Sequence, residues 1–170
     1  MELNQIGEFE FIKNISRGCV IRPDNVIRAI GDDAAAFTVT PDQVSLITTD
    51  LLVEQIHFIR TKITGFDLGY KSMAVNLSDI AAMGGVAREA FVSIGIPLTC
   101  PLDYLEAVYD GMKHLAAKFD VNILGGDTTR SEVDLIINKA VNIYSAEHFG
   151  AFSGSGGKEF FKPECFENRY

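Results

Sequence analysis

Apolar residues recur along the chain with two different periods, which mark its expected elements. Helical spacing covers residues 8–15, 66–83 and 101–119. Shorter apolar runs bounded by Gly, Pro or Asp predict strands over residues 26–30, 34–40, 44–49, 90–96, 121–124 and 133–144. The order is helix, three strands, helix, strand, helix, two strands, which predicts an α+β fold rather than strict βαβ repetition.

Local signals mark the ends of the third strand and of the second helix. The strand over 44–49 ends near Asp50 or continues with loose alternation to Phe58. Asp67 is the expected N-cap of the second helix, and Gly84-Gly85 is its expected stop. The strand over 133–144 is apolar on both faces, which predicts that a second subunit covers part of the sheet.

The periodic part of the chain ends near residue 144. We expect residues 1–144 to form one domain and residues 145–170 to form a divergent tail. The Gly/Ser cluster at 153–157 resembles a linker, so the tail is expected to be poorly ordered or loosely docked.

The composition of the chain excludes several classes of function. The 170 residues are 47% hydrophobic, which is enough for a sizeable core, and the net charge is −8. This charge argues against binding to nucleic acid or to an anionic membrane surface. An acidic protein still binds ATP when divalent cations lie between the two sets of charges. No secretory signal or membrane-spanning run is present, and the 3 Cys lack a disulfide or zinc pattern, so we expect a cytoplasmic protein with reduced thiols.

Aspartates placed at the ends of predicted elements carry the candidate chemistry. Asp32 and Asp33 follow a strand and a glycine, Asp50 ends a strand, and Asp127 follows a strand and Gly125-Gly126. Asp79 shares a helix face with Asn76. Such oxygen ligands suit Mg²⁺, and paired glycines let backbone N–H groups approach a phosphate. Each motif alone more often marks a turn, a cap or a solvated helix position, but their joint occurrence favours a shared metal–phosphate site.

Other chemistry has less support. A lone histidine such as His57 is more often structural, although a neutral donor beside a phosphate is the alternative. The chain has no P-loop, no kinase-type glycine-rich loop and no Gly-x-Ser-x-Gly elbow.

Five segments resemble the thiamine-monophosphate kinase family in order and spacing. They are GEFEFI at 7–12, IGDDAAAF at 30–37, TTDLLVEQIHF at 48–58, GYKSMAVNLSDIAAMGG at 69–85 and LGGDTTR at 124–130. The resemblance covers about residues 5–143. Sibling ATP-dependent synthetases of the aminoimidazole ribonucleotide synthetase-like superfamily are the alternative, but their glycine-rich continuation after the strand-end aspartate is missing after Asp50.

The resemblance implies a fold, a reaction and a set of site residues. The implied fold is a mixed sheet with helices on one face that dimerises through its strands. The implied reaction is direct, Mg²⁺-dependent transfer of the γ-phosphoryl group of ATP to thiamine monophosphate. The implied metal ligands are Asp33, Thr48, Thr49, Asp50, Asp79 and Asp127. Tyr109, Gly126 and Asp127 would contact ATP, and His57 would contact thiamine monophosphate, with Asn76, Asp32 and Arg130 as weaker candidates.

The resemblance ends before the second domain that the family carries. Past about Tyr144 the chain no longer follows the family pattern. The expectation is therefore an incomplete enzyme, and the alternative is a non-catalytic module that binds nucleotide and dimerises.

Overall fold

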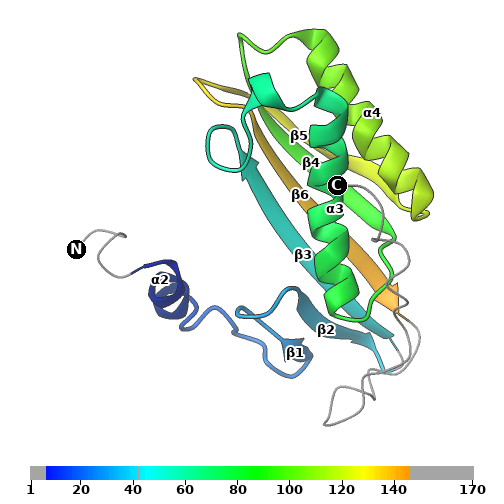
Figure 1. Ribbon diagram of the computed structural model, residues 1–170. Coiled ribbons are helices and arrows are strands. Elements are labelled where there is room, and N and C mark those ends of the chain that lie inside the picture. The colour runs from blue at the N-terminus through cyan, green and yellow to red at the C-terminus, as the bar shows by residue number, and fades with distance from the viewer. Residues whose placement is uncertain (1–6, 42, 146–170) are drawn as a thin grey trace.

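The computed structural model describes residues 7–41 and 43–145 and has the predicted order of elements (Figure 1). The helices are α2 (Glu8–Ile15), α3 (Gly65–Ala82) and α4 (Leu102–Lys118), with a short 3-10 helix η1 (Arg60–Lys62). The strands are β1 (Val26–Arg28), β2 (Ala35–Thr40), β3 (Gln43–Val53), β4 (Glu89–Pro97), β5 (Asn122–Ser131) and β6 (Ile136–Ser145). The tail beyond residue 145 and its predicted lack of order lie outside the described residues.

The strands form one mixed sheet in the order β1-β2-β3-β6-β4-β5. All neighbours are antiparallel except β4 and β5, which are parallel. The last strand in sequence, β6, therefore lies between β3 and β4 at the centre of the sheet. This insertion sets the distance between the candidate site residues of β3 and those of β5.

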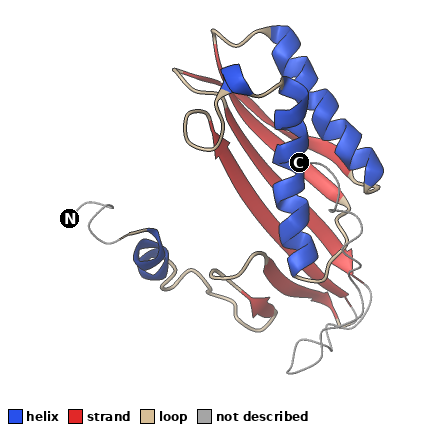
Figure 2. Ribbon diagram, in the orientation of Figure 1, coloured by secondary structure: helices blue, strands red, loops and turns tan. Residues whose placement is uncertain are grey.

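Helices α3 and α4 pack side by side on the same face of the sheet, as Figure 2 shows. Alternate strand residues point toward them and form the core, including Leu46, Leu52, Val92, Ile94 and Ile137. The mixed sheet with helices on one face, which the family resemblance implied, is confirmed.

The two helices touch through glycines. A Cβ atom at Gly69 would collide with the backbone carbonyl oxygen of Val108, and one at Gly111 would collide with that of Phe66. Any larger residue at either position would force the helix axes apart.

The other face of the sheet carries no described helix. Leu51 on β3 is 49% exposed and Phe91 on β4 is 42% exposed, and both point away from α3 and α4. Ser93, Gly95 and Asn138 lie on the same face by strand alternation. We call this surface the open face.

Two local predictions are wrong. The N-cap of α3 is Thr64 rather than Asp67, because the Thr64 Oγ1 accepts a hydrogen bond from the Asp67 backbone N–H at 3.0 Å. The strand predicted to stop at residue 124 continues to Ser131, because pairing with β4 carries the backbone through both glycines. Asp127 thus lies within a strand instead of at its end. Within the described residues, no helix has both the length and the apolar character to span a membrane.

Candidate functional site

A cluster of polar side chains lies between β3 and α3 and includes the carboxylates of Asp50 and Asp79. Thr48 on β3 is 4% exposed, and its Oγ1 donates a hydrogen bond to Oδ2 of Asp79 at 2.9 Å. Asp50 follows on the same side of β3, two residues along the strand. The tertiary fold therefore joins Thr48, Asp50 and Asp79, which are predicted metal ligands from two different segments. We call these three residues the acidic cluster.

The electrostatics of the acidic cluster reflect two neighbouring carboxylates. Burial raises the pKa of Asp50, and the negative charge of Asp79 raises it further. Positive charge on Lys139 and His57 opposes both effects. A group whose protonated form is favoured by burial and by a like charge is a group that a cation would stabilise in its ionised form.

Lys139 lies on β6, the strand next to β3, on the same side of the sheet as Asp50. It is the cross-strand partner of Asp50 and is 1% exposed. Its Nζ donates a hydrogen bond at 2.6 Å to Oγ of Ser72, which in turn donates to the Gly69 carbonyl oxygen at 2.7 Å. Burial lowers the pKa of Lys139 to about 7, although the Asp50 charge opposes this.

Asp33 lies in a groove beside β2, and Thr48 is the member of the acidic cluster that shares this groove. The groove has a volume of about 330 Å³ and is lined by residues that include Asp32, Asp33, Thr48 and Thr49. The Asp33 backbone N–H donates to Oδ1 of Asp32 at 3.1 Å, and Asp32 also pairs with Arg28 at 3.6 Å. The structure therefore places Asp33 in the same groove as Thr48 and Thr49, while the exposed Thr49 side chain leaves β3 on the side opposite to Thr48 and Asp50.

His57 occupies the turn that follows β3. Its Nδ1 accepts a hydrogen bond from the Val53 backbone N–H at 3.0 Å, and its carbonyl oxygen accepts one from Nζ of Lys71 at 2.8 Å. The side chain is exposed. Because Nδ1 is occupied by the backbone, Nε2 is the ring nitrogen available to a ligand.

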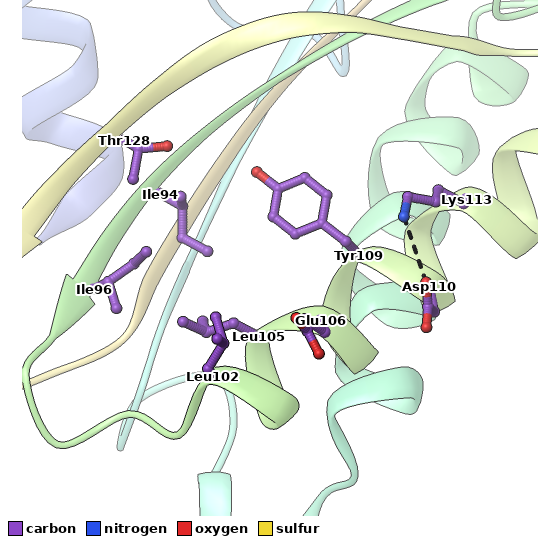
Figure 3. Close-up of a pocket in the computed structure, with 9 residues that line it drawn as sticks. All are labelled: Ile94, Ile96, Leu102, Leu105, Glu106, Tyr109, Asp110, Lys113 and Thr128. Carbon is purple, nitrogen blue, oxygen red and sulfur yellow. Dashed lines mark hydrogen bonds and ion pairs between the residues drawn. The ribbon is translucent and has the colours of Figure 1, made fainter.

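Tyr109 lies at a second groove, between α4 and strands β4 and β5. The groove has a volume of about 570 Å³, and its lining includes Ile94, Tyr109, Lys113 and Thr128. Figure 3 shows the Tyr109 ring directed from α4 toward Ile94 and Thr128, and Lys113 paired with Asp110 at 3.4 Å. An apolar floor with a phenol and a cation at its rim suits a ligand that has a flat ring and negative charge.

Gly126 and Asp127 lie on β5, apart from the acidic cluster. Gly126 has a φ of 150°, and a Cβ there would collide with the carbonyl oxygen of Val92. Strands β6 and β4 separate β5 from β3, which is roughly 14 Å at ordinary strand spacing. The Asp127 side chain also points to the open face, since its neighbour Thr128 faces α4. A single chain does not bring Asp127 next to Asp50.

The weaker candidates Asn76 and Arg130 lie on α3 and β5, respectively. Asn76 is fully buried on α3, and its Oδ1 has no hydrogen-bond partner among the described residues. Arg130 is exposed on β5 and pairs with Glu132 at 3.5 Å.

Sequence reasoning missed Lys139 and Ser72. The signal in the sequence is Lys139, a lysine at an inward-facing position of a strand whose other inward positions are apolar. The prediction that the strand over 133–144 is apolar on both faces overlooks this lysine and the asparagines Asn138 and Asn142, which lie on the open face.

The donor set of the acidic cluster fits a hard divalent cation in part. Carboxylate and hydroxyl oxygens are the ligands that Mg²⁺ takes, and Mg²⁺ also keeps waters and binds substrate phosphates. Among the described residues, no three His, Cys, Asp or Glu side chains gather closely enough to hold a metal on their own. The cluster therefore suits a cation whose coordination is completed by waters and phosphate oxygens.

Comparisons with known proteins converge on one family. The family model described as AIR synthase related protein, N-terminal domain, matches residues 31–142. The thiamine-monophosphate kinase of Bacillus subtilis (strain 168) is 36% identical over 136 residues, covering 80% of this chain and 42% of that protein. The thiamine-monophosphate kinase of Haemophilus influenzae is 36% identical over 133 residues, covering 78% of this chain and 40% of that protein.

Solved structures share the fold. The structure of AaThiL complexed with AMPPCP and TMP superposes with a TM-score of 0.74 at 30% sequence identity, covering 86% of this chain and 44% of that chain. This chain thus spans less than half the length of the relatives it matches.

Proposed function

Because this chain belongs to the family of AIR synthase related protein N-terminal domains, we propose that it is the ATP- and metal-binding half of a thiamine-monophosphate kinase. The observation that carries the proposal is the acidic cluster. Its Thr48–Asp79 hydrogen bond joins two segments that resemble the kinase family, and it does so at an edge with an adjoining groove. The named kinases among the relatives and the AMPPCP complex of a similar structure support ATP as the phosphoryl donor.

The reaction proposed is direct transfer of the γ-phosphoryl group of ATP to the phosphate of thiamine monophosphate. When bound, Mg²⁺ would screen the phosphates and stabilise the charge of the transition state. The residues proposed to hold it are Asp33, Thr48, Thr49, Asp50, Asp79 and Asp127. Tyr109, Gly126 and Asp127 are proposed to contact ATP, and the free Nε2 of His57 is proposed to contact thiamine monophosphate.

A homodimer belongs to this proposal. Asp127 points to the open face, and that face also exposes Leu51 and Phe91. A second copy packed on this face would cover apolar surface and would add its own groups near Asp127. We propose that two chains of this protein associate in the cytoplasm through the open face and that the partner adds groups to the part of the site around Asp127.

A second candidate function is a non-catalytic module that binds nucleotide and dimerises. The observation in its favour is the separation of Asp127 from Asp50 within one chain. The two candidates differ in turnover, not in binding.

The test is a thiamine diphosphate formation assay with ATP, Mg²⁺ and thiamine monophosphate. The variants are Asp50→Ala and Asp127→Ala, and Asp24→Ala is the control because this exposed carboxylate lies before β1. Product that is lost in both site variants and kept in the control supports the kinase. No product, with Mg²⁺-dependent ATP binding that the site variants abolish, supports the binding module. No ATP binding by the wild-type protein contradicts both.

A further inference from the structure

Lys139 has an uncommon position for a lysine. Its side chain is among the largest that are fully buried, and it lies in the interface between β6 and α3. Burying an ammonium group is costly unless it is paired with negative charge and hydrogen bonded. The neighbours of Lys139 therefore have to supply both.

The hydrogen bond to Ser72 meets only part of this requirement. The ammonium has three donors, and Ser72 is neutral. Asp50 is the cross-strand partner of Lys139, so the two side chains leave the sheet on the same side from adjacent strands. Asp79 adds a second carboxylate to the same region, because it accepts the hydrogen bond of Thr48, which lies two residues before Asp50 on the same side of β3. The acidic cluster therefore provides negative charge on the side of the sheet where Lys139 lies.

We propose that the ammonium group of Lys139 is a built-in cation of the acidic cluster, which balances Asp50 without a metal and limits the affinity of the cluster for divalent cations. The second half of this statement rests on the metal site of the proposed function. Lys139 is a positioning residue in this view, since it acts on the ligand Asp50 and touches neither substrate nor metal.

The net charge of Asp50, Asp79 and Lys139 predicts how Lys139 changes the affinity for a divalent cation. Two carboxylates and one ammonium leave the cluster with a single negative charge, so a divalent cation overcompensates it. Without the ammonium, the same two carboxylates match a divalent cation. Removal of the Lys139 charge therefore strengthens divalent binding.

A buried acceptor extends the same polar interface. Asn76 lies one turn beyond Ser72 on α3, and its Oδ1 is buried without a hydrogen-bond partner among the described residues. An acceptor oxygen of this kind favours positive charge nearby. The sequence thus places an unsatisfied oxygen, two carboxylates and one ammonium around the same stretch of α3.

The first experiment measures binding of Mg²⁺ alone by isothermal titration calorimetry at pH 6.5, on the full chain. The variants are Lys139→Met, which keeps the length of the side chain, and Lys139→Gln, which keeps a hydrogen-bond donor for Ser72. Lys118→Met is the control, because it removes one exposed charge at the end of α4. We expect both Lys139 variants to bind Mg²⁺ about tenfold more tightly or better, because the loss of a nearby positive charge strengthens the attraction of two carboxylates for a cation. We expect the control to match the wild type.

The second experiment needs no metal and no change at Lys139. It compares the melting temperature of Asp50→Asn with that of the wild type in EDTA at pH 6.5. If Lys139 balances Asp50, the variant leaves a buried ammonium without its carboxylate and melts lower. If Asp50 is instead an uncompensated charge beside Asp79, the variant melts higher, and the proposal is overturned.

The outcomes separate this proposal from the proposed function. Measurable Mg²⁺ binding that is equal in the wild type and a folded Lys139 variant overturns the limiting role of Lys139 and leaves the kinase proposal intact. No Mg²⁺ binding by any variant overturns the metal site and with it the limiting role. If the Lys139 variants do not fold, the melting temperature of Asp50→Asn decides whether the built-in cation exists.

Discussion

At the scale of single residues, Thr48 and Thr49 are adjacent in sequence but differ in burial. Thr48 is buried and donates to Asp79, whereas Thr49 is exposed. The family resemblance assigns both to metal binding, and only the structure distinguishes their environments.

The pair allows a matched test. Thr48→Val keeps the shape of the side chain and removes the hydrogen bond to Asp79, so we expect the free energy of unfolding to fall by about 1 kcal/mol. Thr49→Val makes the same chemical change on an exposed side chain and should leave the free energy of unfolding nearly unchanged. Urea denaturation of both variants checks this, and an equal loss in the two would contradict a stabilising role for the Thr48–Asp79 bond.

Lys139 gives the stability of the protein a predictable dependence on pH. Burial lowers its pKa to about 7, whereas a lysine in the unfolded chain titrates near pH 10.4. Below pH 7 both states hold the proton and the cost of the buried ammonium is fully present. Between these two values the unfolded chain binds more protons than the folded chain, so the contribution of Lys139 to stability rises with pH.

The measurement is urea denaturation at pH 7 and pH 9. We expect the free energy of unfolding of the wild type to rise by about 2 kcal/mol relative to that of Lys139→Met over this interval. Lys118→Met should follow the wild type at both pH values. A constant difference between wild type and Lys139→Met would show that Lys139 is not buried with a lowered pKa.

At the scale of elements, the contact between α3 and α4 depends on the absence of side chains. Gly111→Ala would place a methyl group against the carbonyl oxygen of Phe66. We expect a loss of roughly 1–3 kcal/mol in the free energy of unfolding from overpacking, despite the higher helix propensity of alanine. Gly125→Ala on β5 is the control, because nothing lies within 4 Å of the new Cβ.

Urea denaturation also serves for this pair. If Gly111→Ala is as stable as the wild type, the two helices do not pack as closely as the structure indicates. The same contact allows α3 and α4 to lie side by side on one face of the sheet.

At the scale of the whole molecule, the open face predicts self-association. Phe91→Glu places a charge on this face, on β4, and should convert the proposed dimer to a monomer because a buried unpaired charge is costly. Size-exclusion chromatography with light scattering measures the mass. Leu98→Glu is the control, since Leu98 is 80% exposed after the end of β4 and its substitution should leave the mass unchanged. A wild-type protein that is monomeric at all concentrations would contradict the dimer.

The order of the elements and most of their bounds could be predicted from local patterns. The helix over Glu8–Ile15 was predicted to the residue, and α3 and α4 to within one residue at each end. Two details could not be predicted. The strand β5 runs through Gly125-Gly126 because β4 supplies the pairing partner, and Thr64 rather than Asp67 caps α3 because its hydroxyl reaches the free backbone N–H.

The candidate residues themselves were also found in the sequence, because aspartates beside glycines and strand ends are visible without a structure. The sequence alone thus determined the types of the elements, the family and the set of carboxylates. Only the tertiary structure decided which carboxylates meet. Because β6 is the last strand to be made and pairs between β3 and β4, it separates Asp127 from Asp50 and brings Lys139 beside Asp50. Such pairing depends on contacts between residues far apart in sequence, which no local pattern records.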